Sequence, residues 1–254
     1  DDGFMHRLWL FILLLLAMLQ QTLVVLLNLA SAIPSVEGKV LRRLNPGVIL
    51  VGTFGVLVLA GAGLLKMPNA TVDGISWLDA LFTSTSAVCV TGLVVVDTSA
   101  TFTMMGQVIL LFLIQIGAFG IVTLTFFLAV VTGQGFSVAG RVFLKDVLSL
   151  ENMRSLGSAI VFLVGSTLLI EGLGALALYH SFNDAMGSGG DKLWSAIFHS
   201  VSAFCNAGFS ILPDGLANVA TQTNFGLQIT ILVLIVLGGM GLPVLMESMS
   251  FWRK

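Results

Sequence analysis

A short motif that occurs twice holds the residues best suited to chemistry in this chain. Residues 80–92 read ALFTSTSAVCVTG and residues 196–208 read AIFHSVSAFCNAG, with seven of thirteen positions identical at an offset of 116. Each copy ends in a glycine, Gly92 or Gly208, which can adopt the positive φ values that other residues resist. A short helix followed by such a turn can aim backbone carbonyl oxygens at a cation and replace its lost water. The motif therefore predicts a site built from main-chain oxygens.

The residues around each turn support the same chemistry. Two short helices are expected, at 77–88 and 193–204, and their C-terminal ends would each present about half a negative charge to a cation. Asp97 and Asp214 follow the turns and are expected at the outer mouth, where carboxylates would concentrate cations. Asp79 is expected to cap the first short helix.

The composition indicates an all-α integral membrane protein. Of the 254 residues, 57% are hydrophobic and 9% are charged, and the mean hydropathy is +1.04, whereas an average soluble domain carries about 25% charged residues. Membrane lipid is the expected environment, and no basic tract suggests a nucleic-acid partner. Apolar runs long enough to cross a bilayer predict membrane spans at residues 8–36, 47–65, 104–131, 156–179 and 225–249.

These segments form a unit of span, short re-entrant helix, turn and span, which occurs twice after one leading span. The pattern divides the chain into a leading transmembrane helix at 1–38 and two pore repeats at 39–135 and 136–254. Small residues at helical spacing act either as hinges below the turn or as close-packing sites, and the sequence leaves both roles open. Such pairs occur in the closing spans at Gly117 with Gly120 and Gly238 with Gly241.

The charges of the loops predict the orientation. Eight of the eleven basic residues lie on one side of the predicted spans, and the positive-inside rule places that side in the cytoplasm. These residues are Lys39, Arg42, Arg43, Arg141, Lys145, Arg154, Arg253 and Lys254, against Arg7, Lys66 and Lys192 on the other side. Both turns are therefore expected to open outward, and the N-terminus falls outside as well.

Two ionisable groups lie inside the predicted membrane region. Glu171 is near the middle of a span, where a charge costs at least ~2.5 kcal/mol on insertion scales, and it serves either the cation path or a hydrogen bond within the bundle. His199 occupies the position of Thr83 in the other repeat and acts either as a pH sensor or as a packing and hydrogen-bonding group. Cys89 and Cys205 are expected to be small buried free thiols rather than a disulfide or a metal site.

The residues around both turns resemble the filter segments of a known superfamily of potassium transporters, that of the TrkH, KtrB and HKT proteins. Residues 86–93, SAVCVTGL, are similar to its first segment and closest to KtrB, and residues 206–209, NAGF, are similar to its second. The resemblance covers about residues 40–252 and implies a potassium-channel-like fold. It implies that ions bind at the carbonyls of Val90, Thr91, Gly92, Leu93, Asn206, Ala207, Gly208 and Phe209.

That family has four such repeats in one chain, and this chain shows two. We therefore expect either a piece of a longer chain or two chains that associate, and the start without Met favours the first. The resemblance also implies a homodimer and a cytosolic regulatory ring, formed by a separate chain, that binds nucleotides. It implies no cofactor in this chain, only K⁺ as the transported ion, with a contribution of Na⁺ left open.

The leading hypothesis is potassium uptake across the cell membrane through a backbone-carbonyl filter, driven by the membrane potential. The alternative is a secondary transporter with broken helices, although both repeats here run in the same direction rather than inverted. An intramembrane enzyme is not expected, because the cysteine that would act as nucleophile is duplicated while His199 accompanies only one copy.

Overall fold

The computed structural model describes residues 46–132, 153–182, 190–213, 215–217 and 219–240. Within these ranges the regular elements are helices, and one isolated antiparallel bridge joins Thr71 to Phe102. The predicted all-α class is confirmed for this part of the chain. The predicted leading helix at 1–38 and the predicted boundary between residues 135 and 136 lie outside it.

The order of the helices follows the order of the predicted segments. The elements are α2 (Pro46–Leu65), α3 (Trp77–Val88), α4 (Thr98–Thr101), α5 (Met104–Thr132), α7 (Met153–Ser181), α8 (Gly190–Phe204), the 3₁₀ helix η3 (Gly215–Ala217), α9 (Val219–Gln222) and α10 (Phe225–Gly239). The bounds of α3 are those predicted, and α8 begins three residues before the predicted start. The short helix α4 was not predicted.

None of the helices that the structure describes reaches both the length and the apolar character required of a membrane span.

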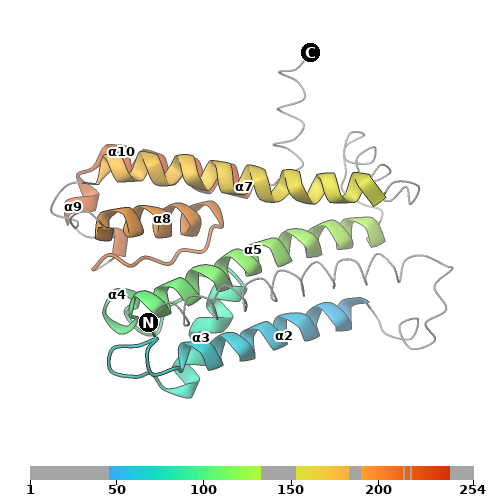
Figure 1. The fold of residues 1–254 in the computed structure, drawn as a ribbon, viewed down its shortest axis with the longest axis horizontal. Helices are drawn as coiled ribbons and strands as arrows, with labels where there is room; N and C mark the ends of the chain where they lie inside the picture. Colours follow the sequence, from blue (N-terminus) through green and yellow to red (C-terminus); the bar gives the residue numbers. More distant parts are fainter. Residues whose placement is uncertain (1–45, 133–152, 183–189, 214, 218, 241–254) are drawn as a thin grey trace, which may run out of the picture.

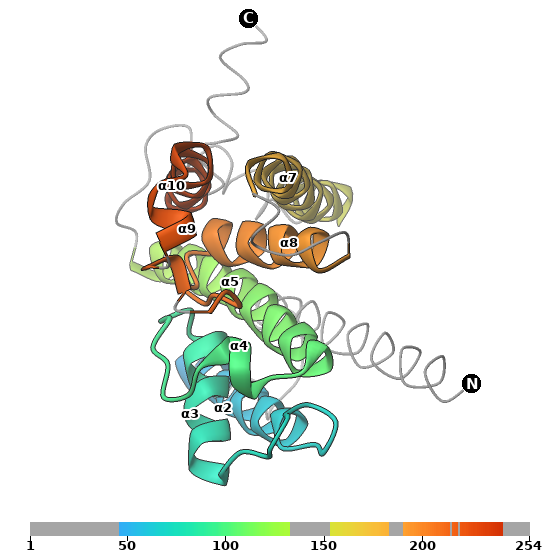
Figure 2. The same cartoon turned by 90° about the vertical axis from the view of Figure 1, so that its left-hand side faces the viewer.

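The helices form two groups that lie one above the other in Figure 1. In the lower group α3 packs against α2 and α5, and in the upper group α8 packs against α7 and α10. Figure 2 shows α7 and α10 side by side above α8, with α5 running beneath them. Helix α5 also contacts α8 and so joins the two groups.

The apolar cores explain this arrangement. Leu65, Leu110 and Ile114 are fully buried in the lower group, and Leu178 and Leu227 are buried in the upper group. Burial of a side chain of this size contributes about 1.5–3 kcal/mol. Phe198 of α8, together with Ala207 and Phe209 that follow it, belongs to the lower core. The residues after α8 are thus embedded against the first half of the chain.

The start of α3 differs in detail from the prediction. Ser76, not Asp79, is the N-cap, and its Oγ accepts a hydrogen bond from the backbone N–H of Asp79 at 3.1 Å. The same Oγ–H donates to Asp79 Oδ2 at 2.6 Å. A serine with an acidic residue three positions later satisfies the unpaired N–H groups of the first turn better than the acidic residue alone.

Candidate functional site

Two loops that follow the two copies of the short helix lie against each other. The first loop comprises residues 89–97, after α3, and the second comprises residues 205–213, after α8. A Cβ added to Gly92 would lie 2.7 Å from the carbonyl oxygen of Ala207 and 3.1 Å from the Cα of Gly208. A Cβ added to Gly208 would lie 3.2 Å from the Cα of Gly92. The two glycines, 116 residues apart, are therefore in direct contact, and neither position can hold a side chain without displacing a loop.

The two loops have the same backbone conformation. Gly92 and Gly208 have φ of 71° and 72°, and the residues two positions earlier, Val90 and Asn206, have φ of 55° and 59°. Each loop thus has two left-handed residues separated by one residue. The prediction that the turns require positive φ at both glycines is confirmed, and the left-handed Val90 is a feature that the sequence did not signal.

The same hydrogen bonds tie each loop to the helix before it. The N–H of Thr91 donates to the carbonyl of Ser86 at 2.9 Å, and the N–H of Ala207 donates to the carbonyl of Ser202 at 2.7 Å. In both cases the residue before the glycine donates to a carbonyl in the last turn of the short helix. The partial negative charge of each helix end therefore lies next to the paired glycines.

Most carbonyls of the predicted filter are open. Within the described residues, the carbonyl oxygens of Val90 to Leu93 and of Asn206 to Gly208 accept no hydrogen bond. Phe209 is the exception, because its carbonyl accepts the hydroxyl of Ser202 at 2.7 Å. Backbone carbonyls need a partner. A run of carbonyls without hydrogen bonds is the set of oxygen ligands that a dehydrated cation would use.

The helices α5 and α10 each pack through a glycine against the end of a short helix, α3 and α8 respectively. A Cβ on Gly117 would overlap the carbonyl oxygen of Val88, and one on Gly238 would overlap the carbonyl oxygen of Phe204. Val88 and Phe204 are the last residues of α3 and α8. Of the two roles left open by the sequence, close packing is therefore the one that these glycines have here. Gly241 lies outside the described residues.

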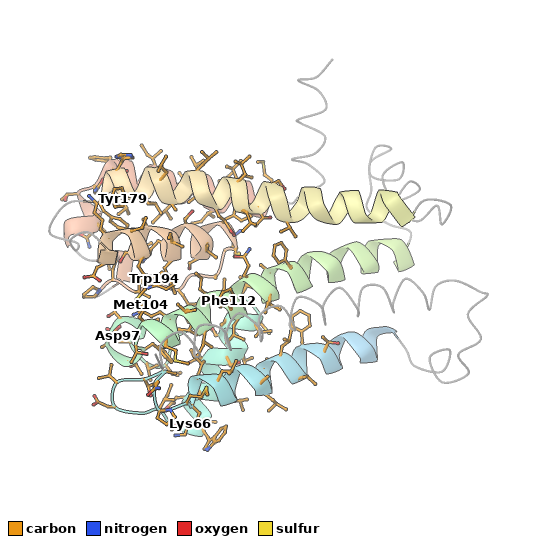
Figure 3. The ribbon with its side chains drawn as sticks, in the orientation of Figure 1. Lys66, Asp97, Met104, Phe112, Tyr179 and Trp194 are labelled. Carbon is orange, nitrogen blue, oxygen red and sulfur yellow. The ribbon has the colours of Figure 1, made fainter. Side chains whose placement is uncertain are left out.

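A cavity of about 680 Å³ opens beside the second loop. Its wall includes Asp97 of the first loop and Asn206, Gly208 and Phe209 of the second. Figure 3 shows Asp97 at the same end of the molecule as Trp194, which belongs to α8. The structure thus brings Asp97 to the second loop, whereas the other predicted mouth residue, Asp214, lies outside the described residues.

Asp97 is held by the start of α4. Its Oδ1 accepts hydrogen bonds from the N–H of Ser99 at 2.8 Å, from the hydroxyl of Ser99 at 2.7 Å and from the N–H of Ala100 at 3.3 Å. The hydrogen bond from the hydroxyl of Ser99, supported by the backbone N–H groups of Ser99 and Ala100, lowers the pKa of Asp97 from its usual value, although partial burial opposes this shift. Asp97 therefore presents a fixed negative charge.

Comparisons with known proteins identify the family. Residues 37–254 match the profile of TrkH, described as a cation transport protein. The chain belongs to the TrkH family. The family resemblance drawn from the two turns is thereby confirmed.

Curated relatives of this TrkH-family chain are named as potassium uptake proteins. The potassium/sodium uptake protein NtpJ of Enterococcus hirae is 36% identical over 217 residues, which are 85% of this chain and 48% of that protein. The Ktr system potassium uptake protein B of Bacillus subtilis is 36% identical over 213 residues, 84% of this chain and 47% of that protein. The Ktr system potassium uptake protein D of the same organism is 34% identical over 220 residues, 84% and 48%. The chain spans about half the length of these relatives.

Glu171 of the TrkH-family chain lies behind the second loop. It is 5% exposed, and its Oε1 lies 3.8 Å from the Sγ of Cys205, which also lies 3.8 Å from the Oε1 of Gln115. The carbonyl of Glu171 accepts the hydroxyl of Ser200 at 2.6 Å. The structure thus shows a carboxyl within the bundle, next to the residue that begins the second loop, and its part in an ion path stays a prediction.

The two cysteines are free, as predicted, but both are half-buried rather than fully buried. His199 is buried and makes hydrogen bonds to Ser195 and Ser210. These bonds favour the packing and hydrogen-bonding role over the pH-sensing role. The link between α8 and α5 through Trp194 Nε1, which donates to Gln107 Oε1 at 2.7 Å, was not foreseen.

Proposed function

We propose that this chain forms part of a pore through which K⁺ enters the cell, with the two loops as part of its selectivity filter. The observation that carries the proposal is the contact of Gly92 with Gly208, each in a left-handed conformation at the end of a short helix. The ligands would be the open carbonyls of Val90, Thr91, Gly92, Leu93, Asn206, Ala207 and Gly208. The carbonyl of Phe209 would have to share its bond with Ser202.

The physical argument is one of replaced hydration. A K⁺ ion gives up water on entering a filter, and backbone carbonyls arranged around an axis replace it at similar energy. The ends of α3 and α8 add a negative potential of about half a charge each. Because the two loops touch, the ion would lie beside the paired glycines, and further loops must close the ring. These come either from additional residues of the same protein or from a second copy, as the family's four repeats imply.

The surroundings of this filter follow from the same proposal. The chain lies in the cell membrane with both loops opening outward and the basic loops in the cytoplasm, and Asp97 and Asp214 flank the outer mouth. A potential of 100 mV contributes about 2.3 kcal/mol per charge toward uptake. Two relatives are named as proteins of Ktr systems, and the homodimer controlled by a separate cytosolic nucleotide-binding ring is what the family resemblance implies for this chain. The name of NtpJ makes Na⁺ a second candidate ion.

The test is ion uptake by cells that lack their own potassium uptake and express the complete reading frame. Gly92→Ser and Gly208→Ser should each lower the ratio of K⁺ to Na⁺ uptake by about tenfold, equivalent to ~1.4 kcal/mol. Gly74→Ser is the matched control, because Gly74 also has a positive φ, of 83°, but a Cβ there would meet nothing within 4 Å. An unchanged ratio in both loop variants, with the protein present in the membrane, would rule out the filter.

A further inference from the structure

The second loop is held beyond its glycine by a chain of hydrogen bonds centred on His199. The ring Nδ1 lies 2.7 Å from the carbonyl oxygen of Ser195, and Nε2 lies 2.8 Å from the Oγ of Ser210. The N–H of Leu212 donates to the same Oγ at 3.2 Å. The chain of bonds therefore runs from the body of α8 to the outer half of the loop.

The partners determine where the protons lie. The carbonyl of Ser195 can only accept, so Nδ1 carries the hydrogen. In the neutral ring Nε2 is then an acceptor, and the hydroxyl of Ser210 donates to it. The Oγ of Ser210 can still accept the N–H of Leu212. Every polar atom of this chain is thus satisfied with a neutral histidine, which suits a ring that is 3% exposed.

The ring is also fixed from its sides. Phe182 and Phe198 contact it edge-to-face, with ring centroids 6.1 and 5.9 Å from that of His199. Contacts of this geometry are favourable beyond the area that they bury. A ring that is clamped by two aromatic side chains and hydrogen-bonded at both nitrogens has one orientation, so it can fix the position of Ser210.

The first loop has no equivalent of this hydrogen-bonded histidine and serine. At the same offset of 116, Thr83 stands in place of His199 and Val94 in place of Ser210. The hydroxyl of Thr83 is buried without a hydrogen-bond partner in the described part of the chain, and Val94 is 55% exposed. The histidine and the serine therefore occur together in one loop and are both replaced in the other.

We propose that His199 is a positioning residue that sets the ion selectivity of the second loop by holding Ser210. This inference rests on the proposed filter function. Ser210 follows Phe209, whose carbonyl is bound by Ser202, so the two serines anchor adjacent residues just outside Gly208. Loss of the His199 anchor leaves the bond from Ser202 as the remaining hydrogen bond from α8 to the outer half of the loop in the described structure. The carbonyls around Gly208 then adapt to a smaller ion, and discrimination against Na⁺ falls.

The experiment compares K⁺ and Na⁺ uptake by variants of the complete reading frame. Ser210→Ala removes the hydroxyl, and His199→Phe keeps an aromatic ring between Phe182 and Phe198 but removes both hydrogen bonds. Each should lower the K⁺/Na⁺ ratio about fivefold, the value of one net hydrogen bond of ~1 kcal/mol. The double variant should be no worse than the more severe single variant, because both changes break one chain of bonds. Ser210→Thr, which keeps a hydroxyl, should retain the ratio.

Thr83→Val is the matched control, because it removes a hydroxyl that makes no hydrogen bond at the equivalent position of the first loop. The ratio does not depend on how much protein reaches the membrane, so a poorly folding His199→Phe is still informative beside Ser210→Ala. A wild-type ratio for Ser210→Ala, or additive effects in the double variant, would overturn the inference. If Gly208→Ser changes the ratio and these variants do not, the filter stands and only the role of His199 fails. If Gly92→Ser and Gly208→Ser both leave the ratio unchanged as well, the filter itself is wrong.

Discussion

The first and second loops have the same backbone at their glycines but differ beyond them. Within the described residues, no hydrogen bond reaches residues 92–96 of the first loop, and Leu93, Val94 and Val95 are 62%, 55% and 48% exposed. In the second loop Phe209 is 2% exposed and Leu212 is 6% exposed. Ser202 binds the carbonyl of Phe209, and His199 binds the hydroxyl of Ser210. The outer half of the first loop, residues 92–96, is largely exposed and makes no hydrogen bond within the described residues, whereas the outer half of the second loop is largely buried and hydrogen-bonded.

This difference separates two sources of loop structure. The glycine turn recurs because the backbone hydrogen bonds of the repeated motif recur. In addition, a glycine of a later helix, Gly117 or Gly238, packs against the end of each short helix. The outer half depends on side chains that the repeats do not share. The inner part of each loop is thus determined by its own repeat, whereas the outer part depends on what surrounds it.

The largest loss of stability is expected from a substitution at the glycine packing that supports both turns. Gly238→Ala would place a Cβ on the carbonyl oxygen of Phe204, and overpacking of this kind costs about 1–3 kcal/mol or more. Gly239→Ala is the adjacent control, because its Cβ would meet only the Nδ2 of Asn206, at 3.9 Å. In a helix the change from Gly to Ala is otherwise favourable by about 1 kcal/mol.

The measurement is thermal unfolding of the purified protein. Gly238→Ala should melt well below the wild type, and Gly239→Ala at or slightly above it. The same loss is expected for Gly117→Ala, since its Cβ would overlap Val88. Equal melting temperatures for Gly238→Ala and Gly239→Ala would show that the shared packing is not what supports the turns.

The helices could be predicted from the sequence because their signals are local. Residues 77–88 are bounded by a polar loop and a glycine turn, and α3 has these bounds. The run of apolar residues from 104 gave the extent of α5 to within one residue. The same is true of the positive φ at Gly92 and Gly208, because glycine is the residue that tolerates it.

The contacts between the repeats could not be predicted in this way. The approach of Gly92 to Gly208 depends on how α5 packs against α8, and the bond between His199 and Ser210 depends on the path of the loop between them. Asn206 is of a type that tolerates the left-handed conformation, so it was a usable signal. Val90 gave none, since a β-branched residue in this conformation is an outlier.

Val90 and Asn206 provide the second prediction, which sharpens the comparison of the two turns. Non-glycine residues in this region cost about 1–3 kcal/mol, and valine is less suited to it than asparagine. Asn206→Val should lower the free energy of unfolding by about 1–2 kcal/mol on this scale, because it also removes the bond from Asn206 Nδ2 to the carbonyl of Phe204 at 3.3 Å.

The reverse change, Val90→Asn, should have a smaller net effect. It relieves strain, but Val90 packs against the lower core, so some apolar contact is lost. Denaturant titration of both single variants and of the double variant measures the difference between their free energies of unfolding. Two equal losses would mean that packing, not backbone conformation, decides what each turn accepts.

The smallest effect is expected at Asp97, the charge that the first loop contributes to the cavity beside the second. The position 116 residues later is Pro213, so this charge has no counterpart at that position. Asp97→Asn removes the charge but keeps a residue that caps a helix well, which separates electrostatics from folding. We expect the KM for K⁺ to rise about twofold at low ionic strength and the maximal rate to stay the same, because an exposed charge steers ions rather than binding them.

The dependence on salt and pH distinguishes this role from a structural one. Exposed charges are screened beyond about 10 Å at 0.1 M salt, so the difference in KM should shrink as an inert salt is added. Because the hydroxyl of Ser99 and two backbone N–H groups lower the pKa of Asp97, the carboxylate is protonated only at a pH below that at which an ordinary aspartate is protonated. The ratio of the two KM values should therefore be constant between about pH 5.5 and 7.5 on the reference scale, and should approach one only when the pH falls through the lowered pKa. A ratio that varies within that interval, or a change in the maximal rate alone, would assign the role to another group. The comparison of the two outer halves would then rest on their anchoring and not on the charge of Asp97.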